Sequence, residues 1–261
     1  MEDIAGRSAN FYTSDDYIRK NPTLHEEDSP WKVGRIIPMV DSLIEGIKKQ
    51  KMTILDVGGG AGLILNHISE HIEKEYAKMV EKYAIDLSPG MLDIQKKNNP
   101  DLKLTLNEDI GGTSLCDKQI DLALMIDVLE HIPESEMALR ELRRISNFVI
   151  FKVPLENCAQ ENILNLLSRG RRRKNETANN GHVNFYSMKE LRRNIEKNTG
   201  IIMKARMDNA FLYYRNSAFY WNSFKRFTKI RYMMAIGIFK ISPRLESFLV
   251  PESVTLLVKC Y

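Results

Sequence analysis

The stretch ILDVGGGAG, from Ile54 to Gly62, places four glycines within five residues directly after an apolar run. A strand that ends at about Val57 and is followed by a helix from about Leu63 would turn on backbone without Cβ atoms, so a ligand could approach the main chain closely. The spacing is G-x-G-x-G, which differs from the G-x-G-x-x-G of dinucleotide sites, and a tight turn alone can also require glycine. The stretch therefore predicts the strand-to-helix turn of an open α/β sheet, with a nucleotide or nucleoside as its expected ligand.

Outside this stretch, short apolar runs alternate with amphipathic segments, which is typical of a mostly parallel sheet with helices on both faces. Strands are expected at residues 53–57, 83–85, 103–106, 122–126, 148–153, 201–206 and 254–259. Helices are expected at residues 33–49, 63–78, 90–97, 134–144, 161–168 and 188–198. Residues 1–32 and residues 211–248, which lie between the last two strands, fall outside the alternation. We expect one domain over residues 1–261, with these two segments as lid candidates and the second of them helical.

The composition is that of a globular protein from a reducing compartment. With 261 residues and 43% hydrophobic content, the chain can bury a full core, and its net charge of +4 is too small to indicate a nucleic-acid partner. Its three cysteines, Cys116, Cys158 and Cys260, form no CxxC pair, which fits neither a zinc site nor a disulfide framework. The polar N-terminus lacks a signal core, and the longest apolar run, Met233 to Phe239, is too short to cross a bilayer. A cytoplasmic location is expected.

Acidic residues stand at the ends of successive predicted strands. Asp56 and Asp86 end the first two strands, Asp109 follows the third, and Asp127 follows the fourth. Because the carboxyl ends of parallel strands meet at one edge of a sheet, these four side chains should ring a single crevice. Asp86 could accept hydrogen bonds from ribose hydroxyls, and Asp109 could accept one from an adenine amino group. Taken singly, each residue can equally be a helix N-cap or a turn former, so the prediction depends on their joint placement.

Four segments together resemble the class I S-adenosylmethionine-dependent methyltransferases. LDVGGGAG, AIDLSPGML, NEDI and IDLALMIDVLEHIPE are similar, in order and spacing, to successive motifs of the small-molecule branch that includes ubiquinone-biosynthesis O-methyltransferases, over about Met52 to Val153. GHVNFYSMKELRRNIEKNTG also resembles the segment before the sixth strand of that branch. The resemblance implies a Rossmann-like, seven-stranded sheet in the order 3-2-1-4-5-7-6 with an antiparallel seventh strand, helices on both faces, and S-adenosylmethionine as the cofactor.

The resemblance also implies which residues contact the cofactor. The glycines of the turn would face its methionine part, and Asp86 its ribose. Asp109 and Ile110 would hold the adenine, while Met91, with Leu87, would flank the ring, although Met91 can equally be an ordinary core residue. The end of the fourth strand would lie beside the reacting methyl group. The whole cofactor-binding set is Asp56, Gly58, Gly60, Gly62, Asp86, Leu87, Met91, Asp109, Ile110 and Asp127.

A methyl transfer requires an acceptor atom held in line with the methyl group and, where needed, a base that removes its proton. His182, in a predicted polar loop, and His131 are the candidates, although a single histidine is more often a surface or capping residue. Asp127, Glu130 and His131 are spaced i, i+3 and i+4, which resembles a magnesium-binding pattern of some quinone O-methyltransferases. The start of a helix explains the same spacing, and we predict no metal.

Two basic segments are relevant to the acceptor. RGRRRK, from Arg169 to Lys174, can bind an anion or remain a solvated loop. A stripe at helical spacing in the segment 211–248 holds Phe224, Phe227, Met234, Ile238 and Ile241, with Lys225, Arg226 and Lys229 on the other side. Such a segment is most often a lid packed on its own domain, but it can also dock on an anionic membrane surface and bring the site to a lipid-linked saccharide. HEEDSPWK, from His25, resembles the N-terminal segment of bacterial methyltransferases of sugar and surface-glycan assembly.

The predicted function is transfer of a methyl group from S-adenosylmethionine to an oxygen or nitrogen of a small-molecule or saccharide acceptor. One alternative is a catalytically silent protein of the same fold that binds a partner through its basic loop and helical segment. Another is a nicotinamide-dependent dehydrogenase, which the glycine spacing disfavours.

Overall fold

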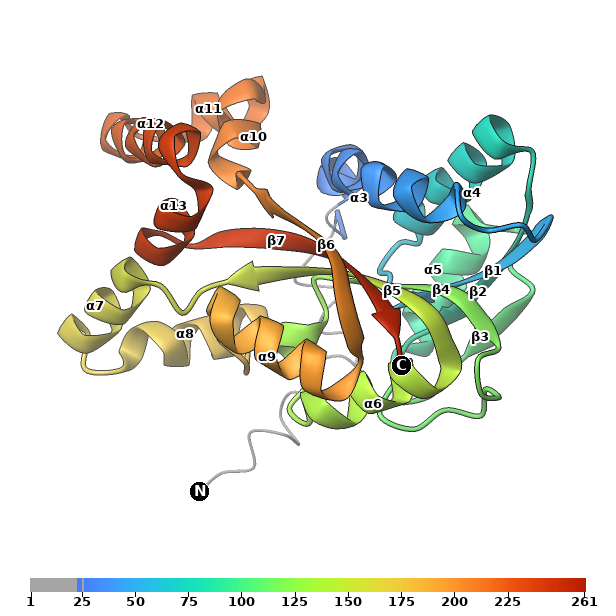
Figure 1. Cartoon of the computed structure of the whole chain (residues 1–261). Helices are drawn as coiled ribbons and strands as arrows, with labels where there is room; N and C mark the ends of the chain where they lie inside the picture. The colour runs from blue at the N-terminus through green and yellow to red at the C-terminus, as the bar shows by residue number, and fades with distance from the viewer. Residues whose placement is uncertain (1–22, 25) are drawn as a thin grey trace.

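The computed structural model describes residues 23–24 and 26–261, which fold around a mixed β-sheet (Figure 1). The seven strands have the order β3-β2-β1-β4-β5-β7-β6, as predicted, and β7 pairs antiparallel with β5 and β6 while the other pairs are parallel. The strands are β1 (Lys51–Val57), β2 (Met79–Ile85), β3 (Leu104–Leu106), β4 (Ile120–Ile126), β5 (Ser146–Leu155), β6 (Gly200–Asp208) and β7 (Glu252–Cys260). Apart from β7, all strands end at the same edge of the sheet.

Helices cover both faces of this sheet. The described α-helices are α3 (Ser29–Ile44), α4 (Leu63–Tyr76), α5 (Pro89–Asn98), α6 (Ser135–Ile145), α7 (Ala159–Leu167), α8 (Arg171–Asn180), α9 (Met188–Asn198), α10 (Ala210–Asn216), α11 (Ala218–Ser223), α12 (Arg226–Ile241) and α13 (Pro243–Leu249). Short 3₁₀ helices η1 (Glu26–Asp28) and η2 (Leu129–His131) precede α3 and α6. α3 and α4 pack on one face, and α6 and α9 pack on the other (Figure 1).

The central strands bury side chains on both faces, which explains their nearly continuous apolar sequences. In β1, Ile54 joins the core under α3 and α4, whereas Leu55 joins the core under α6 and α9. In β4, Leu124 and Met125 divide in the same way. Successive side chains of a strand point to opposite faces, so each central strand contributes to both cores.

The helix expected at residues 33–49 is observed at Ser29–Ile44, and β2 and α8 differ from prediction because their polar residues gave no apolar strand or helix pattern. β2 begins at Met79 rather than at Tyr83, and its Lys82 is buried, with Nζ 3.0 Å from both Asn66 Oδ1 and Asp101 Oδ1. α8 replaces the expected polar loop, although its sequence contains no large apolar residue. Gly170 before it and Gly181 after it both have a positive φ, which glycine adopts without strain.

The segment between β6 and β7 forms α10 to α13, which lie together at the carboxyl edge of the sheet (Figure 1). The start of α3 packs against it: the rings of Trp31 and Tyr213 stack at 5.1 Å, and the Tyr213 hydroxyl donates to the Glu27 carbonyl at 3.1 Å. Of the predicted N-terminal lid, residues 1–22 and 25 lie outside the described residues. Whether both segments move as lids stays a prediction.

Three of the five residues of the apolar stripe predicted in the second segment are exposed, whereas Phe224 and Ile238 are half-buried and the Phe224 ring lies 5.1 Å from that of Tyr232. Phe227, Met234 and Ile241 are 72%, 64% and 84% exposed. α12 instead faces the domain with its buried Ala235 and Ile236. No helix in the described part of the chain has both the length and the apolar character needed to cross a bilayer.

Candidate active site

The glycine turn after β1 forms one wall of a cavity. Gly58, Gly60 and Gly62 have φ values of +61°, +58° and +76°, which residues with a side chain rarely adopt. A Cβ at Gly60 would have no neighbour closer than 4.0 Å, so this backbone borders open space. A Cβ at Gly59 would lie 1.9 Å from Asp56 Oδ2, which explains why glycine stands there.

The cavity has a volume of about 560 Å³, which is in the usual range of small-molecule sites. It lies at the carboxyl ends of β1, β2 and β4, where the acidic strand ends were expected to converge. Nine of the twelve predicted site residues line it: Gly58, Gly60, Asp86, Leu87, Met91, Asp109, Ile110, Asp127 and His131.

The other three predicted residues lie behind the cavity wall. Asp56 is buried beneath the turn. Gly62 packs against α5, where its carbonyl accepts a hydrogen bond from Asn99 Nδ2 at 3.0 Å. His182 lies behind His131, with 4.8 Å between the ring centroids. Asp56 and Gly62 therefore shape the turn, and His182 can act through its neighbour.

Asp86 and Asp109 provide carboxylates at two places along the cavity. Asp86 Oδ1 accepts from the Ser88 amide at 2.8 Å, and burial raises the pKa of Asp86 to about 6. Burial and the neighbouring Asp86 raise the pKa of Asp56 to about 7, and its Oδ2 has no hydrogen-bond partner. Asp109 Oδ1 accepts from the Gly111 amide at 2.7 Å. The cavity thus offers acceptors for hydroxyl and amino donors, beside apolar walls from Leu87 and Met91.

Asp127 is held by two lysines. Lys152 Nζ lies 2.6 Å from its Oδ1 and Lys32 Nζ lies 2.9 Å from its Oδ2. Burial alone would raise the pKa of Asp127, but the two lysines hold it well below its usual range, so the carboxylate stays ionised. Its φ of 55° is an uncommon conformation that the surrounding contacts must support. Lys152 was missed, although a lone lysine inside the apolar strand FVIFKVP is a visible signal.

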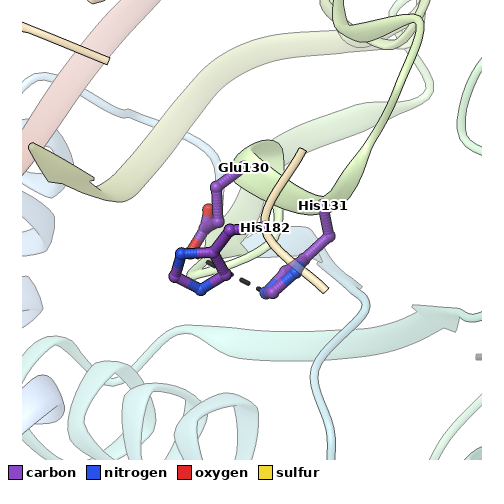
Figure 2. Close-up of side chains that lie close together, drawn as sticks. All are labelled: Glu130, His131 and His182. Atoms are coloured by element: carbon purple, nitrogen blue, oxygen red, sulfur yellow. Dashed lines mark ion pairs between the residues drawn. The ribbon is translucent and has the colours of Figure 1, made fainter. Parts of the chain in front are cut away.

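A cluster of Glu130, His131 and His182 adjoins Asp127 (Figure 2). The loop before α9 docks on η2, because the amides of Val183 and Asn184 both donate to the Glu130 carbonyl at 2.9 and 3.0 Å. Figure 2 shows the three side chains pointing toward one another, with His131 Nε2 3.9 Å from Glu130 Oε1. Residues 51 positions apart in the chain therefore meet beside the cavity.

The three groups of this cluster have different protonation tendencies. Burial and Asp127 raise the pKa of Glu130 to about 8, and its Oε2 has no hydrogen-bond partner. Burial and His182 lower the pKa of His131 to about 4, so His131 is neutral at neutral pH. Burial would lower the pKa of His182, but its hydrogen bond to Glu156, 2.7 Å from Nδ1, raises it above its usual value.

The same cluster has donors that could ligate a divalent cation. Atoms of Glu130, His131 and His182 lie within 4.8 Å of one another, as do those of Glu156, Glu176 and His182. The spacing of Asp127, Glu130 and His131 had suggested a different set, but Asp127 is bound by lysines instead. The prediction that no metal takes part stays open.

The methyltransferase domain family matches the chain over residues 35–198, which is more than half of its length. The chain belongs to this methyltransferase family. The predicted class of enzyme, a class I S-adenosylmethionine-dependent methyltransferase, and its predicted cofactor are thereby confirmed, and the dehydrogenase alternative is excluded. A search of curated protein sequences finds no significant match.

Solved structures share the fold of this methyltransferase at low identity. Geranyl diphosphate C-methyltransferase from Streptomyces coelicolor A3(2), in complex with S-adenosyl-L-homocysteine, is 11% identical with a TM-score of 0.55, over 85% of this chain and 79% of that one. The complex of the Haloferax volcanii Trm112 methyltransferase activator and the putative methyltransferase gives 12% identity and a TM-score of 0.56, over 92% and 97%. The [4+2]-cyclase SpnF is 12% identical with a TM-score of 0.56, over 85% of this chain and 80% of that one.

Proposed function

We propose that this methyltransferase transfers a methyl group from S-adenosylmethionine to an oxygen or nitrogen atom of a small-molecule acceptor. The observation that carries the proposal is the convergence of the glycine turn, Asp86 and Asp127 on one cavity whose wall also includes His131. The cavity is large enough and has the acceptors that a nucleoside requires. The Asp86 carboxylate in the cavity wall can accept hydrogen bonds from ribose hydroxyls, and the open backbone at Gly60 leaves room for the methionine part.

Different residues along the cavity would contact different parts of the cofactor. Gly58 and Gly60 would contact the methionine part, Asp86 the ribose hydroxyls, and Asp109 with Ile110 the adenine. When bound, S-adenosylmethionine supplies a sulfonium methyl group, which is already a strong electrophile. The protein must then hold the acceptor in line with that group and remove a proton where the acceptor atom carries one.

His131 is the group that we propose for proton removal. It lines the cavity next to Asp127, and its lowered pKa keeps it neutral and able to accept a proton at neutral pH. The ionised Asp127 beside it favours the positive charge that His131 would acquire, whereas His182, held by Glu156, packs against the His131 ring and disfavours that charge. This arrangement gives His131 the contact with the acceptor and His182 a positioning role, whereas the sequence had left both histidines as candidate bases.

A saccharide is the specific acceptor that we propose within the small molecules. Its support is the resemblance of HEEDSPWK to methyltransferases of glycan assembly, together with the position of that segment. Its last residue, Lys32, reaches the site and pairs with Asp127. A hydroxyl is the usual nucleophile of a saccharide, and it needs the proton removal that His131 can provide.

Calorimetry and methyl transfer test the proposal. We expect S-adenosylhomocysteine to bind the full chain and NAD to give no heat. We then expect label from methyl-labelled S-adenosylmethionine to appear in a saccharide-containing fraction. Absence of S-adenosylhomocysteine binding would overturn the proposed use of the cavity. Binding without label in any acceptor fraction would favour the catalytically silent alternative, which binds the cofactor but transfers nothing.

A further inference from the structure

Exposed apolar side chains gather on three neighbouring helices at one side of the molecule. α13 contacts both α12 and α7, and Figure 1 shows the three helices together beyond the carboxyl edge of the sheet. Of the 16 large apolar residues exposed in the described part of the chain, four lie on α7, five on α12 and two on α13. These are Ile163, Leu164, Leu166, Leu167, Phe227, Ile230, Met233, Met234, Ile241, Leu245 and Phe248. We call this set the apolar surface.

The orientation of α12 shows that its apolar stripe points away from the protein. At about 100° per residue, Phe227, Ile230 and Met234 share one side of the helix, opposite the buried Ala235 and Ile236. The inner side packs against the domain, and in the part of the chain that the structure describes the outer stripe is exposed to solvent. A row of large apolar side chains held in this way favours a partner that removes them from water.

Basic residues border this stripe. By the same helical geometry, Arg226 and Lys240 flank one edge of the stripe and Arg231 flanks the other. From Phe224 to Leu249 the chain has six lysines and arginines and a single acidic residue, Glu246, which is fully buried. Exposed charge on α12 and α13 is therefore uniformly positive.

We propose that the apolar surface docks on an anionic lipid bilayer, with α12 lying in the plane of the membrane interface. Apolar side chains would enter the boundary between headgroups and acyl chains, and the flanking lysines and arginines would contact acidic headgroups. A second copy of this chain fits less well, because it would bring two uniformly basic faces together. A bilayer matches both the apolar stripe and its positive border.

The docking surface is connected to the active site. The segment α10 to α13 begins at the carboxyl end of β6, the edge at which the cavity lies. Its Tyr213 stacks on Trp31, and the next residue, Lys32, pairs with Asp127 in the cavity wall. Docking would thus place the cavity close to the membrane and suit an acceptor carried on a lipid. This last step rests on the proposed function, whereas the docking does not.

Co-sedimentation of the full chain with vesicles tests the docking. We expect binding to vesicles that contain phosphatidylglycerol at low salt, little binding to pure phosphatidylcholine, and release as salt screens the charges. Phe227→Ser with Met234→Ser should weaken binding about tenfold or more, because both signals are needed for stable docking. The joint change of the bordering Arg226, Arg231 and Lys240 to glutamate should abolish it.

Matched controls make the result decisive. Met79→Ser with Ile201→Ser removes equally exposed apolar residues at the opposite edge of the sheet and should leave binding unchanged. Wild-type protein that stays in the supernatant at low salt would overturn the proposal, as would binding that ignores the Phe227 and Met234 changes. A concentration-dependent dimer abolished by those changes would assign the surface to a second copy instead. S-adenosylhomocysteine calorimetry on the same variants separates docking from cofactor binding, which they should not alter.

Discussion

Replacing Asp86 with asparagine should weaken cofactor binding and at the same time stabilise the free protein. Asp86 lines the cavity at the end of β2, and its Oδ1 accepts from the Ser88 amide at 2.8 Å. Asparagine has nearly the same shape and can keep this hydrogen bond through its own oxygen. It removes the negative charge and replaces one acceptor by a donor. The loss of cofactor affinity and the gain in stability of the free protein can then be measured separately.

The loss of affinity follows from hydrogen bonds to a charged acceptor. An ionised carboxylate that accepts from two ribose hydroxyls gains about 1.5 to 3 kcal/mol over a poorly matched neutral group. Since 1.4 kcal/mol corresponds to a factor of ten, the Kd for S-adenosylhomocysteine should rise about 10- to 150-fold. In the wild type, affinity should also fall as the pH decreases through about 6, where Asp86 becomes protonated.

The gain in stability follows from the raised pKa of the same group. Burial raises the pKa of Asp86 from 3.8 to about 6, so the unfolded chain loses this proton more easily than the folded protein. A carboxyl group with a raised pKa makes the folded state less stable as the pH rises from about 4 to about 6. Allowing for partial exposure to solvent, the free energy of unfolding of the variant should exceed that of the wild type by about 1 to 2 kcal/mol at neutral pH.

Calorimetry with S-adenosylhomocysteine and denaturant unfolding at neutral and acidic pH measure the two effects. Asp93→Asn is the matched control, because Asp93 is exposed on α5 and lies outside the cavity lining. It should change neither quantity. Unchanged cofactor affinity in a folded Asp86→Asn variant would refute the placement of the ribose at Asp86.

Three further predictions concern the turn, the base and the insertion. Gly59→Ala should destabilise the protein by about 2 kcal/mol or more in denaturant unfolding, because its Cβ would lie 1.9 Å from the carboxylate beneath the turn. His131→Ala should lower kcat about 100-fold with nearly unchanged S-adenosylhomocysteine affinity, and His182→Ala should lower it less; equally small effects would contradict both roles. Burial raises the pKa of Glu246 from 4.5 to about 7, and burial with the neighbouring Glu246 raises that of Glu252 from 4.5 to about 10, so the attachment of α13 should weaken progressively as the pH rises from about 4.5 to about 10. Hydrogen exchange of residues 210–249 should increase accordingly, and Glu246→Gln should flatten that dependence.

Local sequence determined the strands, the glycine turn and the acidic ends of the strands. Apolar runs and helical periodicity can be read from neighbouring residues alone. They predicted the strands of the sheet and the helices that cover it because a sheet that is covered on both faces needs apolar side chains on both. The convergence of Asp86, Asp109 and Asp127 needed no knowledge of distances, since parallel strands of one sheet must end at one edge. The family resemblance then supplied the strand order, which the structure has.

Partners that come from distant parts of the chain were decided only by the tertiary structure. The lysine of β5 and the lysine of α3 meet at Asp127, and His182 reaches His131 because the loop before α9 donates two hydrogen bonds to η2. α8 escaped prediction because its polar residues carry no apolar periodicity, and ion pairs such as Arg172 with Glu161 accompany it. Such contacts depend on how elements dock, which local pattern does not encode.

The orientation of α12 shows the same limit. Periodicity identified a stripe that includes Phe227 and Met234, but a stripe of apolar residues looks the same in sequence whether it faces a core or solvent. Which side is buried depends on where the neighbouring helices lie, and here the inner side is occupied by Ala235 and Ile236. The sequence alone determined that α12 has an apolar stripe; only tertiary packing, which covers one side of the helix and leaves the other free, decided that the stripe is exposed.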